Sequence, residues 1–306
     1  MQHLLAAIDL GTNTARLLIG RLQPDGTVQP VYISRQITRL GGGFTRESGI
    51  SNEARSRTLA ALRDFATEMR RHDVQRSRAV ATSAVRDAIN GPDFCREVFD
   101  TTGIKLDVID GEEEGRLTLR GVLAGIDERP ASLFVFDVGG GSTEYTLSHG
   151  ETALFTRSLP LGVVRLTEGK GESGAMTDKI DRELATLRGE MERRSLLDHL
   201  DKAVLVGTAG TATTLAAISM GMVDYDYRRV NNHVLTRAEI SSIFQQLLPL
   251  SPAERLMVPG MEKGREDLII AGCLLTLRTM ELFCFDRMKV SDFGLLEGVL
   301  MSVHEQ

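Results

Sequence analysis

Two short glycine loops in this chain are each entered from an apolar run that ends in an aspartate. The first, at residues 6–14, reads Ala-Ala-Ile-Asp-Leu-Gly-Thr-Asn-Thr, and the second, at residues 133–143, reads Leu-Phe-Val-Phe-Asp-Val-Gly-Gly-Gly-Ser-Thr. Both continue into the alternation of apolar and polar residues that is typical of a strand. A carboxylate followed by glycine N–H groups and hydroxyls suits a metal-chelated phosphate. The pattern predicts an internal duplication whose two loops clamp one phosphate chain.

The length and composition fit an ordinary globular enzyme. With 306 residues, of which 42% are hydrophobic and 25% charged, the chain exceeds the usual size of one domain. Cys95, Cys273 and Cys284 lie in apolar or helical patterns without paired spacing. They predict reduced thiols in a cytoplasmic protein. No basic and apolar leader and no apolar run of bilayer length is recognised, so no membrane contact is expected.

The net charge of −6 argues against a chain that binds nucleic acid as a polyelectrolyte. A polyanion would have to meet a local basic lining. Each basic residue near an expected loop is, taken alone, more typical of solvated surface charge. The candidates for such a lining are Arg35, Arg39, Arg46, Arg157, Arg165, Lys170 and Arg265.

Alternating strand and helix patterns predict an α/β fold with mixed sheets flanked by helices. The first half is expected to hold strands near 4–10, 15–22, 27–38, 77–82 and 105–109, with helices after residues 51, 91 and 111. The pattern restarts after Leu133 with a strand, a glycine loop, a hairpin and a strand near 153–159. Further helices are expected near 175–198, 211–220, 236–248 and 266–284, and Thr236 with Glu239 predicts a capping box at the third of these. Residues 169–174 match a dinucleotide-binding fingerprint, but no apolar strand precedes them and charged residues fill them, so a flexible loop is expected there.

Two domains are expected, over residues 1–122 and 123–306. No segment rich in proline, glycine and serine divides them, so the helix at 116–123 is expected to join them directly and to leave a hinged cleft. The last helix, at about 295–306, could pack back on the first domain. Two further glycine turns, at 207–211 and 292–294, also follow strands. Each alone is a weak signal, because glycine serves ordinary turns as readily as phosphate loops.

The ordered set of motifs resembles the exopolyphosphatase and guanosine pentaphosphate phosphohydrolase family in its short, two-domain form. The motifs are Ile-Asp-Leu-Gly-Thr-Asn-Thr at 8–14, Ala-Thr-Ser-Ala-Val-Arg-Asp-Ala at 81–88, Gly-Glu-Glu-Glu-Gly-Arg-Leu at 111–117, Asp-Val-Gly-Gly-Gly-Ser-Thr-Glu at 137–144, Gly-Thr-Ala-Gly-Thr at 207–211 and Ser-Asp-Phe-Gly-Leu-Leu-Glu-Gly at 291–298. The resemblance implies the actin, sugar kinase and Hsp70 superfold, with two duplicated ribonuclease-H-like domains and an active site in the cleft between them.

The resemblance also implies roles for individual residues. Glu114 would be the catalytic base that prepares a water for in-line attack, and Arg86 would grip phosphate. Asp137, with Asp9 as second candidate, would bind Mg²⁺, or alternatively Mn²⁺. The implied phosphate-binding residues are Thr12, Asn13, Gly139, Gly140, Gly141, Ser142, Gly207, Thr208 and Gly210.

Simpler explanations exist for these residues one at a time. The three glutamates at 112–114 could only favour a helix N-terminus, Arg86 could pair with Asp87, and Asp9 and Asp137 could cap turns. The ordered combination favours an enzyme that releases orthophosphate from inorganic polyphosphate, with guanosine pentaphosphate as a second substrate and a homodimer left open. The alternatives are an ATP-dependent kinase of the same superfold and a regulator that senses guanosine tetra- or pentaphosphate with little turnover.

Overall fold

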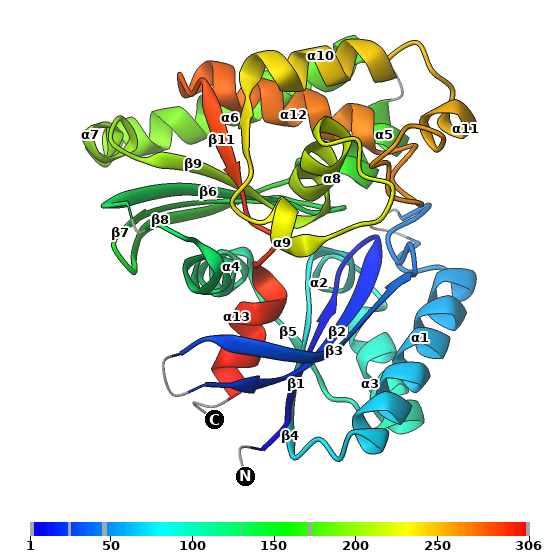
Figure 1. Cartoon of the computed structure of the whole chain (residues 1–306). Helices are drawn as coiled ribbons and strands as arrows, with labels where there is room; N and C mark the ends of the chain where they lie inside the picture. The colour runs from blue at the N-terminus through cyan, green and yellow to red at the C-terminus, as the bar shows by residue number, and fades with distance from the viewer. Residues whose placement is uncertain (1–2, 24–25, 45–47, 129, 171–172, 304–306) are drawn as a thin grey trace. The chain divides into compact units, whose positions relative to one another are not determined.

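The computed structural model describes residues 3–23, 26–44, 48–128, 130–170 and 173–303. The chain forms two compact units, which are Met1–Ala124 with Gly294–Gln306, and Gly125–Phe293 (Figure 1). The chain thus passes from the first unit to the second after Ala124 and returns to the first unit at Gly294. Within the described ranges, no helix is both long and apolar enough to cross a membrane.

The first unit contains a five-stranded sheet in the order β3-β2-β1-β4-β5. The first three strands form an antiparallel meander, and the last two run parallel to β1. This arrangement is the mixed sheet that the sequence predicted. The strands are β1 (Leu5–Leu10), β2 (Thr14–Leu22), β3 (Val28–Ile37), β4 (Arg76–Ala81) and β5 (Leu106–Val108).

Helices cover both faces of this sheet, as the alternating side chains of β1 require. Ala6 and Ile8 belong to a core shared with α1 and α3, whereas Leu5 and Ala7 belong to a core shared with α4 and α13. The chain thus returns from its far end to complete the first unit (Figure 1). The helices are α1 (Asn52–Arg71), α2 (Ser83–Arg86), α3 (Gly91–Thr102), α4 (Gly111–Gly125) and α13 (Leu295–Ser302).

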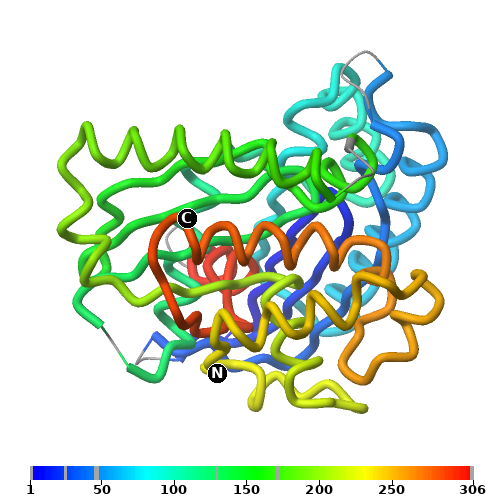
Figure 2. Tube along the Cα trace, turned by 90° about the horizontal axis from the view of Figure 1, so that it is seen from above, coloured from blue at the N-terminus to red at the C-terminus, as the bar shows by residue number. Residues whose placement is uncertain are grey.

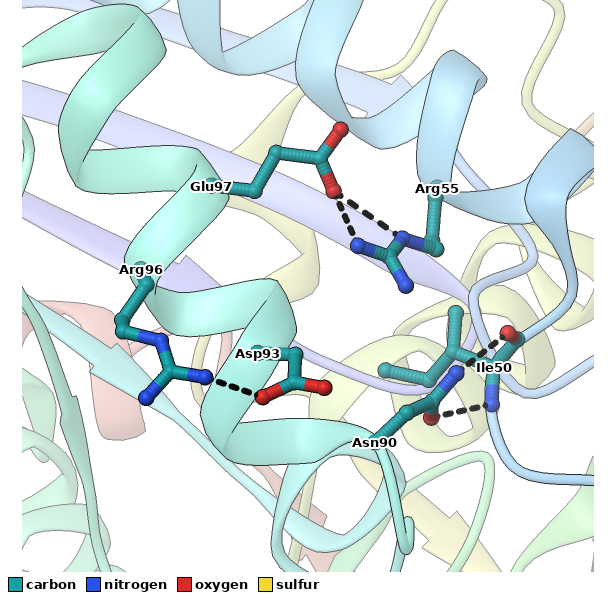
Figure 3. A network of polar contacts seen from close by, with 6 residues as sticks. All are labelled: Ile50, Arg55, Asn90, Asp93, Arg96 and Glu97. Carbon is teal, nitrogen blue, oxygen red and sulfur yellow. Dashed lines mark hydrogen bonds and ion pairs between the residues drawn. The ribbon is translucent and has the colours of Figure 1, made fainter.

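Asn90 fixes the entry to α1 against the start of α3 (Figure 3). Its side-chain amide donates to the carbonyl of Ile50 at 2.9 Å, and its Oδ1 accepts the N–H of the same residue at 2.8 Å. Farther along the two helices, Arg55 donates to Glu97, through Nε at 3.0 Å and also through Nη2. The Asn90 side chain therefore satisfies both the N–H and the carbonyl of Ile50, which is only 2% exposed.

We expect Asn90→Ala to lower the free energy of unfolding of the first unit by about 2–4 kcal/mol, because it leaves two buried backbone groups unsatisfied. Native-state hydrogen exchange in α1 and α3 measures this loss. Asp93→Ala is the matched control, since the only ion pair of Asp93 with the described residues is the solvent-exposed one with Arg96 on α3. Asp93 also lies in the first turn of α3, so its replacement should cost about 1 kcal/mol or less. Equal protection in Asn90→Ala and the wild type would contradict the expectation.

The second unit repeats the topology of the first. Its six-stranded sheet has the order β10-β11-β9-β6-β7-β8. Five of these strands, read as β8-β7-β6-β9-β11, match the order of the first sheet, and β10 is an antiparallel addition at the edge. The strands are β6 (Ser132–Val138), β7 (Thr143–His149), β8 (Thr152–Leu159), β9 (Val204–Thr208), β10 (Val234–Thr236) and β11 (Arg287–Val290).

Apolar helices pack on one face of the second sheet. Figure 2 shows α12 running between α6 and α10, and all three contribute to one core with Phe134 and Phe136 of β6. The helices are α5 (Val163–Lys170), α6 (Ser173–Arg193), α7 (Leu197–Leu200), α8 (Ala209–Ser219), α9 (Tyr227–Val230), α10 (Arg237–Leu247), α11 (Pro252–Arg255) and α12 (Ile269–Leu282).

One segment differs from its expected form. Residues 169–174 read as a loop in sequence, but Gly169 and Lys170 end α5, and α6 begins at Ser173; residues 171 and 172 lie outside the described ranges. The buried residues Val163, Val164 and Leu166 anchor α5 in the core of the second unit. Tertiary packing therefore prevails over the low helix propensity of the glycine.

Candidate active site

The loops after three strands of the first unit meet at one edge of its sheet. The N–H of Thr82 donates to the carbonyl of Leu10 at 3.3 Å, and the N–H of Ile109 donates to the carbonyl of Ala81 at 3.1 Å. These bonds join the ends of β1, β4 and β5. Because the carboxyl ends of parallel strands are the usual place for ligands in α/β sheets, this edge is the natural site.

The first glycine loop presents unused hydrogen-bond donors at this edge. Its turn is closed by a bond from the N–H of Gly11 to the carbonyl of Thr14 at 3.0 Å, and the Thr12 hydroxyl lies 3.0 Å from that of Ser83. The N–H groups of Thr12 and Asn13 donate to no acceptor among the described residues. The Asn13 side-chain amide is also buried and has no hydrogen-bond partner there. Such a concentration of donors suits an anion.

Glu114 and Arg86 lie together beside this loop. Glu114 is in the first turn of α4 and is 6% exposed, and its Oε2 lies 3.5 Å from Nη1 of Arg86. The same Nη1 donates to the carbonyl of Ile109 at 2.9 Å. Nε of Arg86 also lies 3.7 Å from Oδ1 of Asp87, which is the local ion pair given above as the simpler explanation for Arg86. The structure therefore brings a buried carboxylate and a cation to the same point of the edge.

Asp9 has a partner that sequence reasoning missed. The residue directly opposite it on β2 is Arg16, whose Nε and Nη2 donate to Oδ2 of Asp9 at 2.9 and 2.6 Å. Asp9 is 5% exposed, so this charge is balanced within the protein. A carboxylate bound in this forked way is a weaker candidate for a direct metal ligand.

The second glycine loop repeats the first. The N–H of Gly139 donates to the carbonyl of Ser142 at 3.0 Å, while Val163 and Val164 donate to the carbonyls of Gly139 and Gly140 at 3.0 and 2.9 Å. The N–H groups of Gly140 and Gly141 find no acceptor in the ranges that the structure covers. The loop carbonyls are therefore turned back into the protein, and the free N–H groups are left for an anion.

Asp137 lies opposite Glu144, a residue absent from the predicted site. The two are direct partners in the β6–β7 ladder and are 6% and 2% exposed. Directly paired residues on antiparallel strands share a face of the sheet. Ser158 donates to Oε1 of Glu144 at 2.6 Å. Glu144 stands at the same hairpin spacing from Asp137 as Arg16 from Asp9, and that spacing is the signal that could have found it.

These two buried carboxylates fit a hard divalent cation. Mg²⁺ prefers one or two carboxylates and completes its coordination with water and phosphate oxygens. Over the part of the chain that the structure describes, no group of three or more His, Cys, Asp or Glu side chains forms a closed metal site. Asp137 with Glu144 is therefore the better candidate for a shared site with phosphate, and Asp9 the weaker.

The third loop combines a packing role with a strained backbone. Gly207 lies in β9, where a Cβ would come within 2.6 Å of Sδ of Met288, so packing accounts for its glycine. Thr208 pairs with Asp137 in the ladder, which places it beside the candidate cation site. Ala209 has φ 61°, a left-handed conformation that is rare for alanine. Sequence reasoning missed that strain.

Gly210 is the remaining phosphate-binding candidate in this loop. It is the second residue of α8, and a Cβ there would lie 1.5 Å from Nη2 of Arg265. Arg265 is held by Glu262, which accepts from its Nε at 2.7 Å. Of the basic residues considered from sequence, Arg265 thus reaches a glycine loop, whereas Arg46 lies outside the described residues.

The site residues divide between the two units. The first unit brings together Asp9, Thr12, Asn13, Arg86 and Glu114. The second brings together Asp137, Gly139, Gly140, Gly141 and Ser142, with Thr208 and Gly210 following β9.

Comparison with known proteins places the chain in a family. The model of the Ppx/GppA phosphatase family matches residues 21–306. The chain is 33% identical over 313 residues to exopolyphosphatase 2 of Mycobacterium tuberculosis, covering 98% of each protein.

Solved structures agree with that match. A Ppx/GppA family member from Aquifex aeolicus superposes with a TM-score of 0.81 at 30% identity, covering 99% of this chain and 97% of that one. An exopolyphosphatase from Cytophaga hutchinsonii superposes with a TM-score of 0.88 at 26% identity, covering 99% and 98%. The predicted fold class, with two mixed sheets flanked by helices in an actin-like arrangement, is thus confirmed. This chain is a phosphatase that belongs to the Ppx/GppA family.

Proposed function

We propose that this protein releases terminal orthophosphate from inorganic polyphosphate by Mg²⁺-assisted attack of water. The observation that carries the proposal is the pairing of buried Glu114 with Arg86 beside a loop of unused N–H donors. A phosphoryl group needs cationic and N–H donors for its oxygens, and its attacking water needs a positioned carboxylate. Family membership and the exopolyphosphatases among its relatives support the substrate class.

Glu114 is proposed as the general base. Its position in the first turn of α4, with a backbone bond from its N–H to the carbonyl of Asp110 at 3.0 Å, fixes the start of its side chain. Arg86 is proposed to bind the oxygens of the transferred phosphoryl group, and its bond to the carbonyl of Ile109 keeps the guanidinium in place. A forked arginine can contact two phosphate oxygens, which a lysine does less well.

The remaining groups are proposed to hold the chain of phosphates. The N–H groups of Thr12, Asn13, Gly140 and Gly141 would donate to its oxygens, with hydroxyls of Thr12 and Ser142 beside them. Asp137 and Glu144 would hold Mg²⁺, which neutralises charge on the phosphate oxygens when it is bound. Mn²⁺ has the same preference for oxygen ligands and is an alternative.

Two alternative functions and one second substrate can be distinguished by what the protein releases. A kinase of the same superfold would use ATP and form product only with an acceptor, whereas guanosine pentaphosphate as a second substrate would also yield orthophosphate. A sensing regulator would bind guanosine tetra- or pentaphosphate without turnover. The buried Glu114 favours hydrolysis over sensing, since a protein that only binds has no need of a base.

A phosphate-release assay on polyphosphate, guanosine pentaphosphate and ATP, each with Mg²⁺, separates these functions. We expect the kcat/KM for phosphate release to be highest with polyphosphate and lower with ATP. Release from guanosine pentaphosphate alone would mean that this nucleotide, and not polyphosphate, is the substrate. Release from none of the three would refute hydrolysis. Binding of the guanosine nucleotides without release would identify the regulator.

A further inference from the structure

The turn that follows β3 is tied to the first glycine loop. The N–H groups of Thr38 and Arg39 both donate to the carbonyl of Asn13, at 3.0 and 2.9 Å, and the N–H of Gly41 donates to the carbonyl of Thr12 at 2.9 Å. A Cβ on Gly41 would come within 2.3 Å of Cγ2 of Thr12, so the two segments approach as closely as a glycine allows. Loop and turn therefore form one local structure.

Helix α1 holds the same turn from its other side. Arg57 donates from Nε to the carbonyl of Thr38 at 3.0 Å, and its Nη1 pairs with Glu53 at 2.6 Å on the same helix. Both backbone groups of Thr38 are thus engaged, one by the glycine loop and one by α1. The turn is positioned by the fold of the first unit.

Two buried polar side chains in this local structure point to a ligand. The hydroxyl of Thr38, 1% exposed, and the amide of Asn13, 7% exposed, have no hydrogen-bond partner in the described part of the chain. Buried groups of this kind are nearly always satisfied by protein, water or a bound molecule. The Thr38 hydroxyl and Nδ2 of Asn13 are both donors, and their residues are bonded to each other through their backbones, so an anion bound at this junction would accept from them.

Arg39 carries the only full positive charge of the turn 38–41, and its backbone is strained. Its φ is 45°, in the left-handed region, and its residue is exposed. A residue other than glycine persists in that region when the surrounding structure imposes it, and such strain gathers at functional sites. Here the strained conformation is held by the hydrogen bond from the N–H of Arg39 to the carbonyl of Asn13, which keeps Arg39 beside the first glycine loop.

We propose that Arg39 binds a non-reacting phosphate of the substrate, next to those held by the first glycine loop, and so favours longer chains. This inference rests on the proposed polyphosphate function. The ligand it names is a linear polyanion that extends beyond its terminal phosphoryl group. Because the contact is to a phosphate that does not react, it contributes equally to substrate and transition-state binding.

The test is Arg39→Gly, which removes the guanidinium and also relieves the strained φ. The KM for long-chain polyphosphate should rise about 3- to 10-fold with kcat nearly unchanged, while the KM for tripolyphosphate changes less. The increase should shrink at high salt, because an exposed charge is screened. The melting temperature should stay within about 3 °C of the wild type. Arg39→Lys should restore part of the affinity.

The matched control is Arg63→Ala, which removes an exposed charge from α1 of the same unit and should leave KM unchanged. Calorimetry measures the binding of long-chain polyphosphate to each variant without turnover. It therefore separates the inference about Arg39 from the proposed hydrolase function. Weaker binding by Arg39→Gly supports the inference even where the wild type releases no phosphate, a result that would overturn the proposed function alone. Equal binding by Arg39→Gly and wild type overturns the inference.

Discussion

Replacing Glu114 with glutamine should reduce kcat for phosphate release by about 10²–10⁴-fold while leaving the affinity for polyphosphate almost unchanged. The amide keeps the size of the side chain but cannot accept the proton of the attacking water. Because Glu114 is buried beside Arg86, the neutral amide also removes a negative charge from the site. Binding of an anionic substrate should therefore be equal or slightly tighter.

Glu113→Gln is the matched control for this variant. Glu113 is the preceding residue of α4 and pairs with Nη2 of Arg78 at 2.6 Å, with 40% of its side chain exposed. Its replacement should leave kcat within about 2-fold, since partly exposed ion pairs contribute little. Single-turnover kinetics and equilibrium binding measure the two quantities separately. If Glu114→Gln lost binding but kept its rate at saturation, Glu114 would be a binding residue and not the base.

Asp137→Asn should raise the Mg²⁺ concentration needed for half-maximal activity by at least about 10-fold. Changes to the outer partners of metal ligands already cost 10- to 100-fold in affinity, so loss of a ligand charge should cost no less. Glu144→Gln should act in the same direction, because Glu144 is the direct cross-strand partner of Asp137. Binding of Mn²⁺ to the protein without substrate, followed by electron paramagnetic resonance, gives a second measure.

Asp127→Asn provides the comparison within the second unit. Asp127 pairs with Lys289 at 2.7 Å, and 56% of its side chain is exposed. The hydrogen bond from Lys289 lowers the pKa of Asp127 below its ordinary value, so its carboxylate is charged at neutral pH and Asp127→Asn, like Asp137→Asn, removes a carboxylate charge. Its Mg²⁺ titration should match that of the wild type. A titration for Asp137→Asn that overlays the wild type would exclude Asp137 from the cation site.

The local pattern of the sequence predicted most of the fold. Apolar runs predicted the first strand of each meander and the alternation after each glycine loop predicted the second, and the matching loops at Asp9 and Asp137 predicted the duplication that the two sheet orders display. These features depend on residues that are near in sequence. The same is true of α10, whose capping box of Thr236 and Glu239 is visible in the sequence and forms in the structure.

The features that could not be predicted depend on contacts between distant segments. Helix α5 is stabilised by its core contacts and was expected to be partly loop. The neutralisation of Asp9 by Arg16 and the pairing of Asp137 with Glu144 require the exact register of two hairpins. The reason for glycine at position 41 is the close approach of Thr12, which no local pattern reveals.

The most direct test of the account is phosphorus NMR of long-chain polyphosphate during incubation with the protein and Mg²⁺. Terminal hydrolysis predicts that the orthophosphate signal grows as the internal signal falls, while the number of chain ends does not increase. The Glu114→Gln protein should show neither change on the same time scale. A rising signal from chain ends would mean cleavage within the chain, and an unchanged spectrum with the wild type would mean that polyphosphate is not the substrate. Either result would contradict the account.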